Sequence, residues 1–89
     1  MTRLHLVIIG RVQAIGYRWF ARERAARLKL TGWAANRSDG AVEAEVQGQD
    51  KNIKLFIEIL KTGHPYARVD SIDKKAVKTE ALESSFDIR

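Results

Sequence analysis

The spacing of apolar residues changes several times along the chain, and each change predicts a new element. Residues 4–9 (LHLVII) are apolar on both faces of an alternating pattern, which is typical of a central β-strand. Between residues 17 and 30 the apolar positions recur at helical spacing, with charged residues between them and no Pro or Gly, and this predicts a helix. The chain therefore begins with a strand, a loop and a helix.

A β-hairpin is predicted next. Val42, Ala44 and Val46 alternate with polar residues. Asp39-Gly40, just before them, is typical of a two-residue turn in which both residues have positive φ angles. We therefore expect one strand on each side of that turn.

The second helix has the clearest signal. Asp50 is expected as its N-cap, and Gly63 is found where the residue that follows a helix often adopts a left-handed conformation. Between them, four apolar residues are spaced i, i+3, i+4 and i+7: Ile53, Phe56, Ile57 and Leu60.

The remainder of the chain predicts further strands. Residues 67–77 alternate irregularly, which indicates a strand with a bulge or bend, and Phe86 and Ile88 indicate a short terminal strand. No repeat or linker divides the sequence, so we expect residues 1–89 to form one domain. The order β-α-β-β-α-β predicts an α+β fold, the ferredoxin-like α/β sandwich, with two helices on one face of a mostly antiparallel four- or five-stranded sheet.

The composition argues against a metal site and against a membrane segment. The chain has no cysteine, and His5 and His64 lie far apart without a ligand motif, so we expect no metal ion and no cofactor. The apolar run that ends at Gly10 is too short for a secretory signal or a membrane span. We therefore expect a cytoplasmic protein that does not bind membranes.

Positive charge gathers in the first half of the sequence. The net charge is +5; residues 1–40 carry eight Lys or Arg against two acids, and residues 41–89 carry eight against nine. This distribution indicates an anionic partner, either a small phosphate compound or a nucleic acid. The alternative is that Arg22, Arg24 and Arg27 only form the solvated face of a helix.

The loop between the first strand and the first helix is a candidate anion site. It reads GRVQAIGYR over residues 10–18, and the N–H groups at a helix start have no intrahelical acceptor. A cation in the first turn, Arg18, is unfavourable there by about 0.3–1 kcal/mol unless an anion binds. The other interpretation is that Arg18 pairs with Glu45 or Asp39. The spacing of the glycines matches neither a nucleotide P-loop nor a dinucleotide fingerprint.

Asn36 is a second candidate, in the stretch GWAANRSDG at residues 32–40. In the predicted sandwich the strand that ends near Asn36 approaches the 10–18 loop, and its amide can both donate a hydrogen bond to a water molecule and accept one from it. The alternative is a side chain that shapes the Asp-Gly turn.

Together these two stretches resemble the paired signature of the acylphosphatase family, whose loop reads roughly G-x-V-Q-G-V-x-F-R and whose second block reads G-W-V-x-N. The similarity extends over the whole chain and includes VEAEVQG at 42–48, PYARV at 65–69 and SFDIR at 85–89.

The resemblance implies a hydrolase that converts acyl phosphates to a carboxylate and inorganic phosphate without a metal ion. It implies that Arg18 holds the phosphoryl oxygens and that Asn36 orients the attacking water. It further implies a cradle of main-chain N–H groups around the phosphate, formed by Arg11, Val12, Gln13, Ala14, Ile15, Gly16, Tyr17 and Arg18.

The main departure from the family pattern is Ala14, which replaces the glycine that usually follows Gln; Ile15 also replaces the usual valine. If that position needs a positive φ, the methyl group costs about 1–2 kcal/mol or reshapes the cradle. Gly16, where the family often has a larger residue, offers flexibility next to it. An anion-binding module of the same fold without turnover is therefore an alternative to the enzyme.

A nucleic-acid-binding sandwich is the other alternative. Glu43 and Glu45 on the expected open face argue against it, and Trp19 and Trp33 are expected in or near the core rather than stacked on bases. We therefore expect a monomer that binds a small acyl phosphate and inorganic phosphate, and no nucleic acid.

Overall fold

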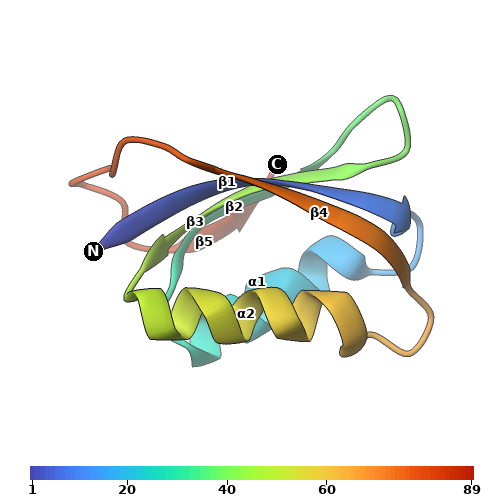
Figure 1. Cartoon of the computed structure of the whole chain (residues 1–89), viewed down its shortest axis with the longest axis horizontal. Helices are drawn as coiled ribbons and strands as arrows, with labels where there is room; N and C mark the ends of the chain where they lie inside the picture. Colours follow the sequence, from blue (N-terminus) through green and yellow to red (C-terminus); the bar gives the residue numbers. More distant parts are fainter.

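The computed structural model of the chain describes residues 1–89 and contains two helices and five strands (Figure 1). Their order is β1 (Thr2–Arg11), α1 (Tyr17–Arg27), β2 (Thr31–Asn36), β3 (Val42–Gly48), α2 (Asp50–Thr62), β4 (Arg68–Ala76) and β5 (Phe86–Ile88). No helix has the length and apolar character that a membrane crossing requires.

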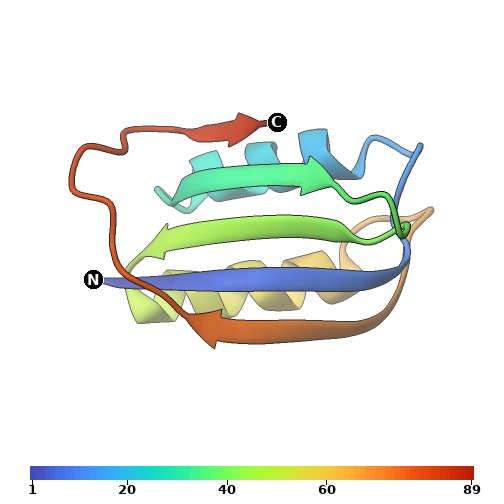
Figure 2. The same cartoon turned by 90° about the horizontal axis from the view of Figure 1, so that it is seen from above.

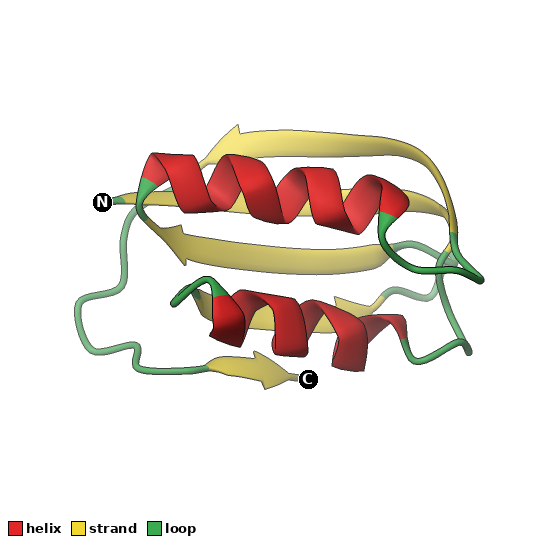
Figure 3. Cartoon of the chain, turned by 90° about the horizontal axis from the view of Figure 1, so that it is seen from below, coloured by secondary structure: helices red, strands yellow, loops and turns green.

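The five strands form one sheet in the order β4-β1-β3-β2-β5, with β4 and β5 at its edges (Figure 2). Neighbouring strands are antiparallel except β2 and β5, which run parallel. Both helices cover the same face of the sheet (Figure 3). The predicted ferredoxin-like sandwich is confirmed, with five strands.

The core lies between the sheet and the helices. Leu6 and Ile8 of β1 are fully buried there, and Phe56 and Leu60 of α2 pack into the same cluster. The alternation of β1 thus turns one side of the strand toward the helices and leaves Arg3 and His5 on the other face.

The hairpin turn differs from the prediction. The Arg37 carbonyl accepts a hydrogen bond from Gly40, and Arg37 N–H donates to the Ala41 carbonyl, so the connection is longer than two residues. Gly40 has a positive φ, and Asp39 does not. Asp39 instead accepts a hydrogen bond from Ala41 N–H through its side chain, so it stabilises the turn without a left-handed backbone.

The helix ends also differ from the predictions. Helix α1 stops at Arg27 because Lys29 adopts a φ of 56°, which a helix cannot continue. The N-cap of α2 is Gln49, with Asp50 in the first turn. Gly63 is not left-handed: a Cβ there would crowd the Ile59 carbonyl oxygen and the Phe20 ring, so close packing explains the glycine.

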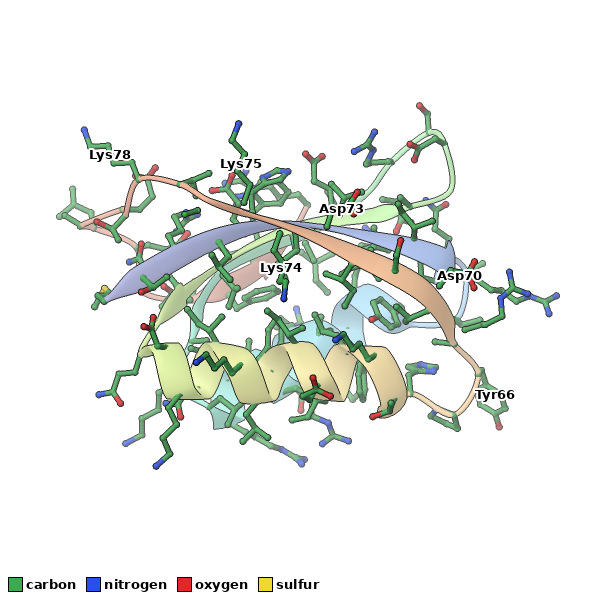
Figure 4. The ribbon with its side chains drawn as sticks, in the orientation of Figure 1. Tyr66, Asp70, Asp73, Lys74, Lys75 and Lys78 are labelled. Carbon is green, nitrogen blue, oxygen red and sulfur yellow. The ribbon has the colours of Figure 1, made fainter.

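Strand β4 contains the predicted bulge. Ile9 pairs with Ser71 and Gly10 with Val69, which leaves Asp70 as an extra residue. Figure 4 shows Asp73 and Lys75 on the side of β4 turned away from the helices and Lys74 on the helix side. Charges on both faces of an edge strand disfavour pairing with another chain.

The open face of the sheet carries a buried cation. Arg3 is 3% exposed, and its guanidinium contacts Glu45 and Glu83, each at 2.7 Å. His5 adds a contact of 2.8 Å to Glu45. The segment between β4 and β5, which holds Glu83, is thereby fastened to β1 and β3.

Removing the charge of Glu45 should weaken the fold in a pH-dependent way. Burial alone would raise the pKa of Glu45, but hydrogen bonds from His5 and Arg3 outweigh it and lower that pKa. Its contribution to stability is therefore complete above the ordinary value of 4.5 and is lost as the pH falls through the lower folded-state pKa. Glu45→Gln should cost about 1.5–3 kcal/mol of unfolding free energy at pH 7.

Urea unfolding at pH 7 and at pH 3 tests this. The difference between the variant and the wild type should shrink at the lower pH. Glu58→Gln is the matched control, because Glu58 is exposed and pairs only with Lys61 on α2; it should change stability by less than about 0.5 kcal/mol. An equal deficit for Glu45→Gln at both pH values would contradict the prediction.

Candidate active site

A hollow of about 290 Å³ lies where β1 ends and α1 begins. Its walls come from the β1–α1 loop, the first turn of α1, the end of β2 and β5: Val12, Gln13, Ala14, Gly16, Tyr17, Arg18, Trp19, Asn36 and Ile88. The two predicted catalytic residues, Arg18 and Asn36, thus line one pocket.

The main chain around this pocket is rich in free donors. The N–H groups of residues 12–16 make no main-chain hydrogen bond, and those of the first turn of α1 lack intrahelical acceptors. Ala14 and Gly16 have φ angles of 63° and 74°. Left-handed residues in such a loop turn successive N–H groups to one side, which forms a concave site for an anion.

Arg18 adds a full positive charge to this end of the helix. It forms no ion pair with Glu45 or Asp39, each of which has another cationic partner. Its Nη1 donates a hydrogen bond of 2.9 Å to the main-chain oxygen of Arg89. The first turn of α1 contains no acidic residue, so no carboxylate there offsets the guanidinium and the helix dipole.

Asn36 is the last residue of β2, pairs with Val42 and is exposed on the pocket wall. The alternative role in the turn falls to Asp39, whose side chain caps Ala41 N–H. The Asn36 amide therefore faces the pocket as a neutral group that can both donate and accept hydrogen bonds.

Two residues of the predicted cradle do not line the pocket. Arg11 is the last residue of β1 and pairs with Arg68 of β4. The Ile15 side chain packs against the core. Two others contribute main chain only: Val12 and Tyr17 are each 1% exposed, and burial raises the pKa of the Tyr17 phenol, whose hydroxyl donates to the Leu60 carbonyl oxygen at 2.7 Å.

Comparison with known proteins identifies relatives of the whole chain. The acylphosphatase family model matches residues 4–88. An acylphosphatase of Thiobacillus denitrificans is 43% identical over the full chain and 98% of its own length. The chain belongs to the acylphosphatase family. Among solved structures, the acylphosphatase of Bacillus subtilis superposes with a TM-score of 0.94 at 32% identity, covering 100% of this chain and 99% of that one. That of Coxiella burnetii gives 0.92 at 34% identity, covering 99% and 92%.

Several contacts of this acylphosphatase-family site are not visible in the sequence. The amide nitrogen of Gln13 donates to the Arg37 and Ala41 carbonyl oxygens at 2.8 and 2.9 Å, so this side chain ties the loop to the β2–β3 turn. Ile88 reaches the pocket because β5 lies parallel to β2 and pairs with Ala34. Only the folded chain brings these partners together.

Trp19 corrects a prediction. It is 56% exposed and lines the pocket rather than the core, because the inner side of α1 is already occupied by Tyr17, Phe20, Ala21 and Ala25. Trp33 is half-buried on the open face, where the Arg89 guanidinium lies 4.6 Å from its ring centroid.

Restoring glycine at position 14 should relieve strain in the loop. Ala14 has the positive φ at which a Cβ costs about 1–2 kcal/mol, and the entropy that Gly adds to the unfolded chain offsets part of this. Ala14→Gly should therefore raise the unfolding free energy by up to about 1 kcal/mol in urea titrations and leave acylphosphatase activity equal or higher. A clear fall in activity would mean that the loop is adapted to alanine.

Proposed function

We propose that this chain hydrolyses the carboxyl–phosphate bond of acyl phosphates to a carboxylate and inorganic phosphate, without a metal ion. Membership in the acylphosphatase family supports the reaction. The structural observation that carries the proposal is one pocket in which unpaired loop N–H groups, Arg18 and Asn36 meet.

The phosphoryl group would lie in the loop. The free N–H groups of residues 12–16 and the N-terminal end of α1 present partial positive charge, and Arg18 presents a planar set of donors suited to phosphoryl oxygens. These groups are fixed before substrate arrives, so they stabilise the charge of the transition state at little reorganisation cost.

Asn36 would hold the attacking water. The water oxygen forms a bond to phosphorus while the bond from phosphorus to the acyl oxygen breaks, and the carboxylate leaves with the electron pair. The proton of the water passes to the phosphate of the substrate or to the departing carboxylate. Because a carboxylate is a good leaving group, position and charge supply most of the catalysis.

The acyl group would extend toward the mouth of the pocket. Trp19 and Ile88 are the hydrophobic lining residues that lie outside the loop that takes the phosphate. An exposed tryptophan beside a hydrophobic residue suits an aryl or alkyl group, so benzoyl phosphate is a suitable test substrate.

Arg18→Ala should lower kcat/KM for benzoyl phosphate by about 10³-fold or more, because the positive charge that faces the phosphoryl oxygens is lost. The fold should persist, since the hydrogen bond to Arg89 is exposed. The measurement is phosphate release with chelator present and spontaneous hydrolysis subtracted. Arg22→Ala, which changes an arginine of α1 outside the pocket, is the control. Undiminished activity in Arg18→Ala would remove the assigned role.

Asn36→Ala should reduce kcat by about 10²-fold or more, the effect of deleting one well-placed polar group. Inorganic phosphate should still inhibit with nearly unchanged affinity, because the loop and Arg18 remain. Steady-state kinetics with phosphate as inhibitor separates the two quantities. If phosphate affinity collapses together with kcat, Asn36 holds the phosphate and not the water.

A phosphate-binding module without turnover is the second candidate, and the strained backbone at Ala14 favours it. Inorganic phosphate would then raise the melting temperature of the protein, whereas benzoyl phosphate would disappear no faster than in buffer. Turnover that is lost in Arg18→Ala would exclude this candidate.

We propose further that the protein works as a cytoplasmic monomer that does not bind nucleic acid. The carboxylates of Glu43 and Glu45 on the open face of the sheet, where stacking aromatics would be needed, support the last point. Sedimentation, cell fractionation and an oligonucleotide titration at low salt test the three statements.

A further inference from the structure

His64 reaches the β1–α1 loop from a distant part of the chain. It lies in the connection between α2 and β4, two residues before Tyr66, which Figure 4 labels. Its half-buried ring packs edge-on against Phe20, with centroids 5.1 Å apart, and lies 5.9 Å from the ring of Tyr17. These contacts fix the plane of the imidazole beside the start of α1.

Both ring nitrogens of His64 have partners, and the partners define its tautomer. The Tyr66 N–H donates to Nδ1 at 3.1 Å, so Nδ1 carries a lone pair. Neutral His64 therefore carries its proton on Nε2, which donates to the Ile15 carbonyl oxygen at 3.0 Å. The imidazole connects the main chain before β4 to the main chain of the loop.

The Ile15 carbonyl shares its peptide plane with the Gly16 N–H. In a trans peptide these two groups point in opposite directions. The carbonyl is directed to His64, whose ring packs on Phe20 and Tyr17, so the N–H is directed away from them. Gly16 lines the pocket, and its N–H makes no main-chain hydrogen bond.

No main-chain hydrogen bond fixes the orientation of this peptide plane. It joins Ile15 to Gly16, whose φ is 74°, and Ala14 just before it has a φ of 63°. Gly16 has no Cβ, so its φ can change, and the peptide plane can rotate, at little steric cost. A rotated plane would point the carbonyl oxygen, which repels anions, toward the site.

We propose that His64 is a positioning residue: by holding the Ile15 carbonyl, it keeps the Gly16 N–H directed at the phosphoryl group. The inference rests on the proposed function for the identity of the ligand. It assigns to the α2–β4 connection a role in anion affinity that neither Arg18 nor Asn36 supplies.

Two amide substitutions separate the hydrogen bonds of His64. The amide nitrogen of Gln lies near the position of Nε2, so His64→Gln can still donate to the Ile15 carbonyl. The amide oxygen of Asn lies near the position of Nδ1, so His64→Asn can still accept from the Tyr66 N–H but does not reach Ile15. Both variants lose the aromatic ring, and they differ from each other by one methylene group.

Inorganic phosphate is the probe, with its dissociation constant measured by calorimetry and the Gly16 amide followed by ¹H–¹⁵N NMR. His64→Asn should weaken phosphate binding about tenfold, the effect of one hydrogen bond to a charged acceptor, and reduce the phosphate-induced shift of Gly16. His64→Gln should bind within about threefold of the wild type. Asn52→Ala, which removes the hydrogen bond from Asn52 to the Leu28 carbonyl far from the pocket, is the stability control.

Equal phosphate affinities for the Asn and Gln variants would overturn the proposal. So would a loss in Asn52→Ala equal to that in His64→Asn, since the effect would then follow general stability. The test needs no turnover. A wild type that binds phosphate but does not hydrolyse benzoyl phosphate therefore contradicts the proposed function alone, and the comparison of the His64 variants still decides this inference.

Discussion

Hydrogen bonding of β1 along both of its edges is the constraint on which the site depends. β3 pairs with β1 as far as Ile8, whereas β4 continues to Arg11. Beyond Ile8 the chain therefore leaves β3 and follows β4, which opens space between the end of β1 and the end of β2. At Gly10 the two strands come so close that a Cβ would collide with the Arg68 carbonyl oxygen. The glycine before the loop thus serves the sheet, whereas Gly16 borders the open pocket.

The loop that starts at this point is held from outside rather than by its own hydrogen bonds. Gln13 binds the β2–β3 turn, the Tyr17 hydroxyl binds α2, and His64 binds the Ile15 carbonyl. Three separate segments of the chain thereby fix a backbone whose own N–H groups stay free. A loop that satisfied those donors internally would have none to offer an anion. Because other segments fix the loop backbone, its unpaired N–H groups keep a defined direction.

The periodicity of apolar residues was enough to predict those elements that bury a single continuous face. Helix α2 has a continuous apolar side, so its position could be predicted, and the sandwich topology in turn placed Arg18 and Asn36 near each other. The Asp39-Gly40 turn was predicted wrongly in detail because the Asp39 side chain offers the backbone another hydrogen bond. Trp19 was predicted wrongly because hydrophobicity alone does not say that the inner side of α1 is already filled. The His64 contact had no local signal, since its partner Ile15 is 49 residues away and the bond goes to main chain.

The pairing of β1 with β4 also makes the site depend on contacts between distant parts of the sequence. Gly10 meets Val69 and Arg11 meets Arg68, so the end of β1 is ordered only after the chain has closed a long loop that contains α1, the hairpin and α2. Closing such non-local contacts costs entropy before the contacts stabilise the chain, and it slows folding. The anion site is therefore complete only when β4 has paired with the end of β1. An anion that binds there recognises only the finished sheet, and by mass action it favours that sheet over every partly folded form.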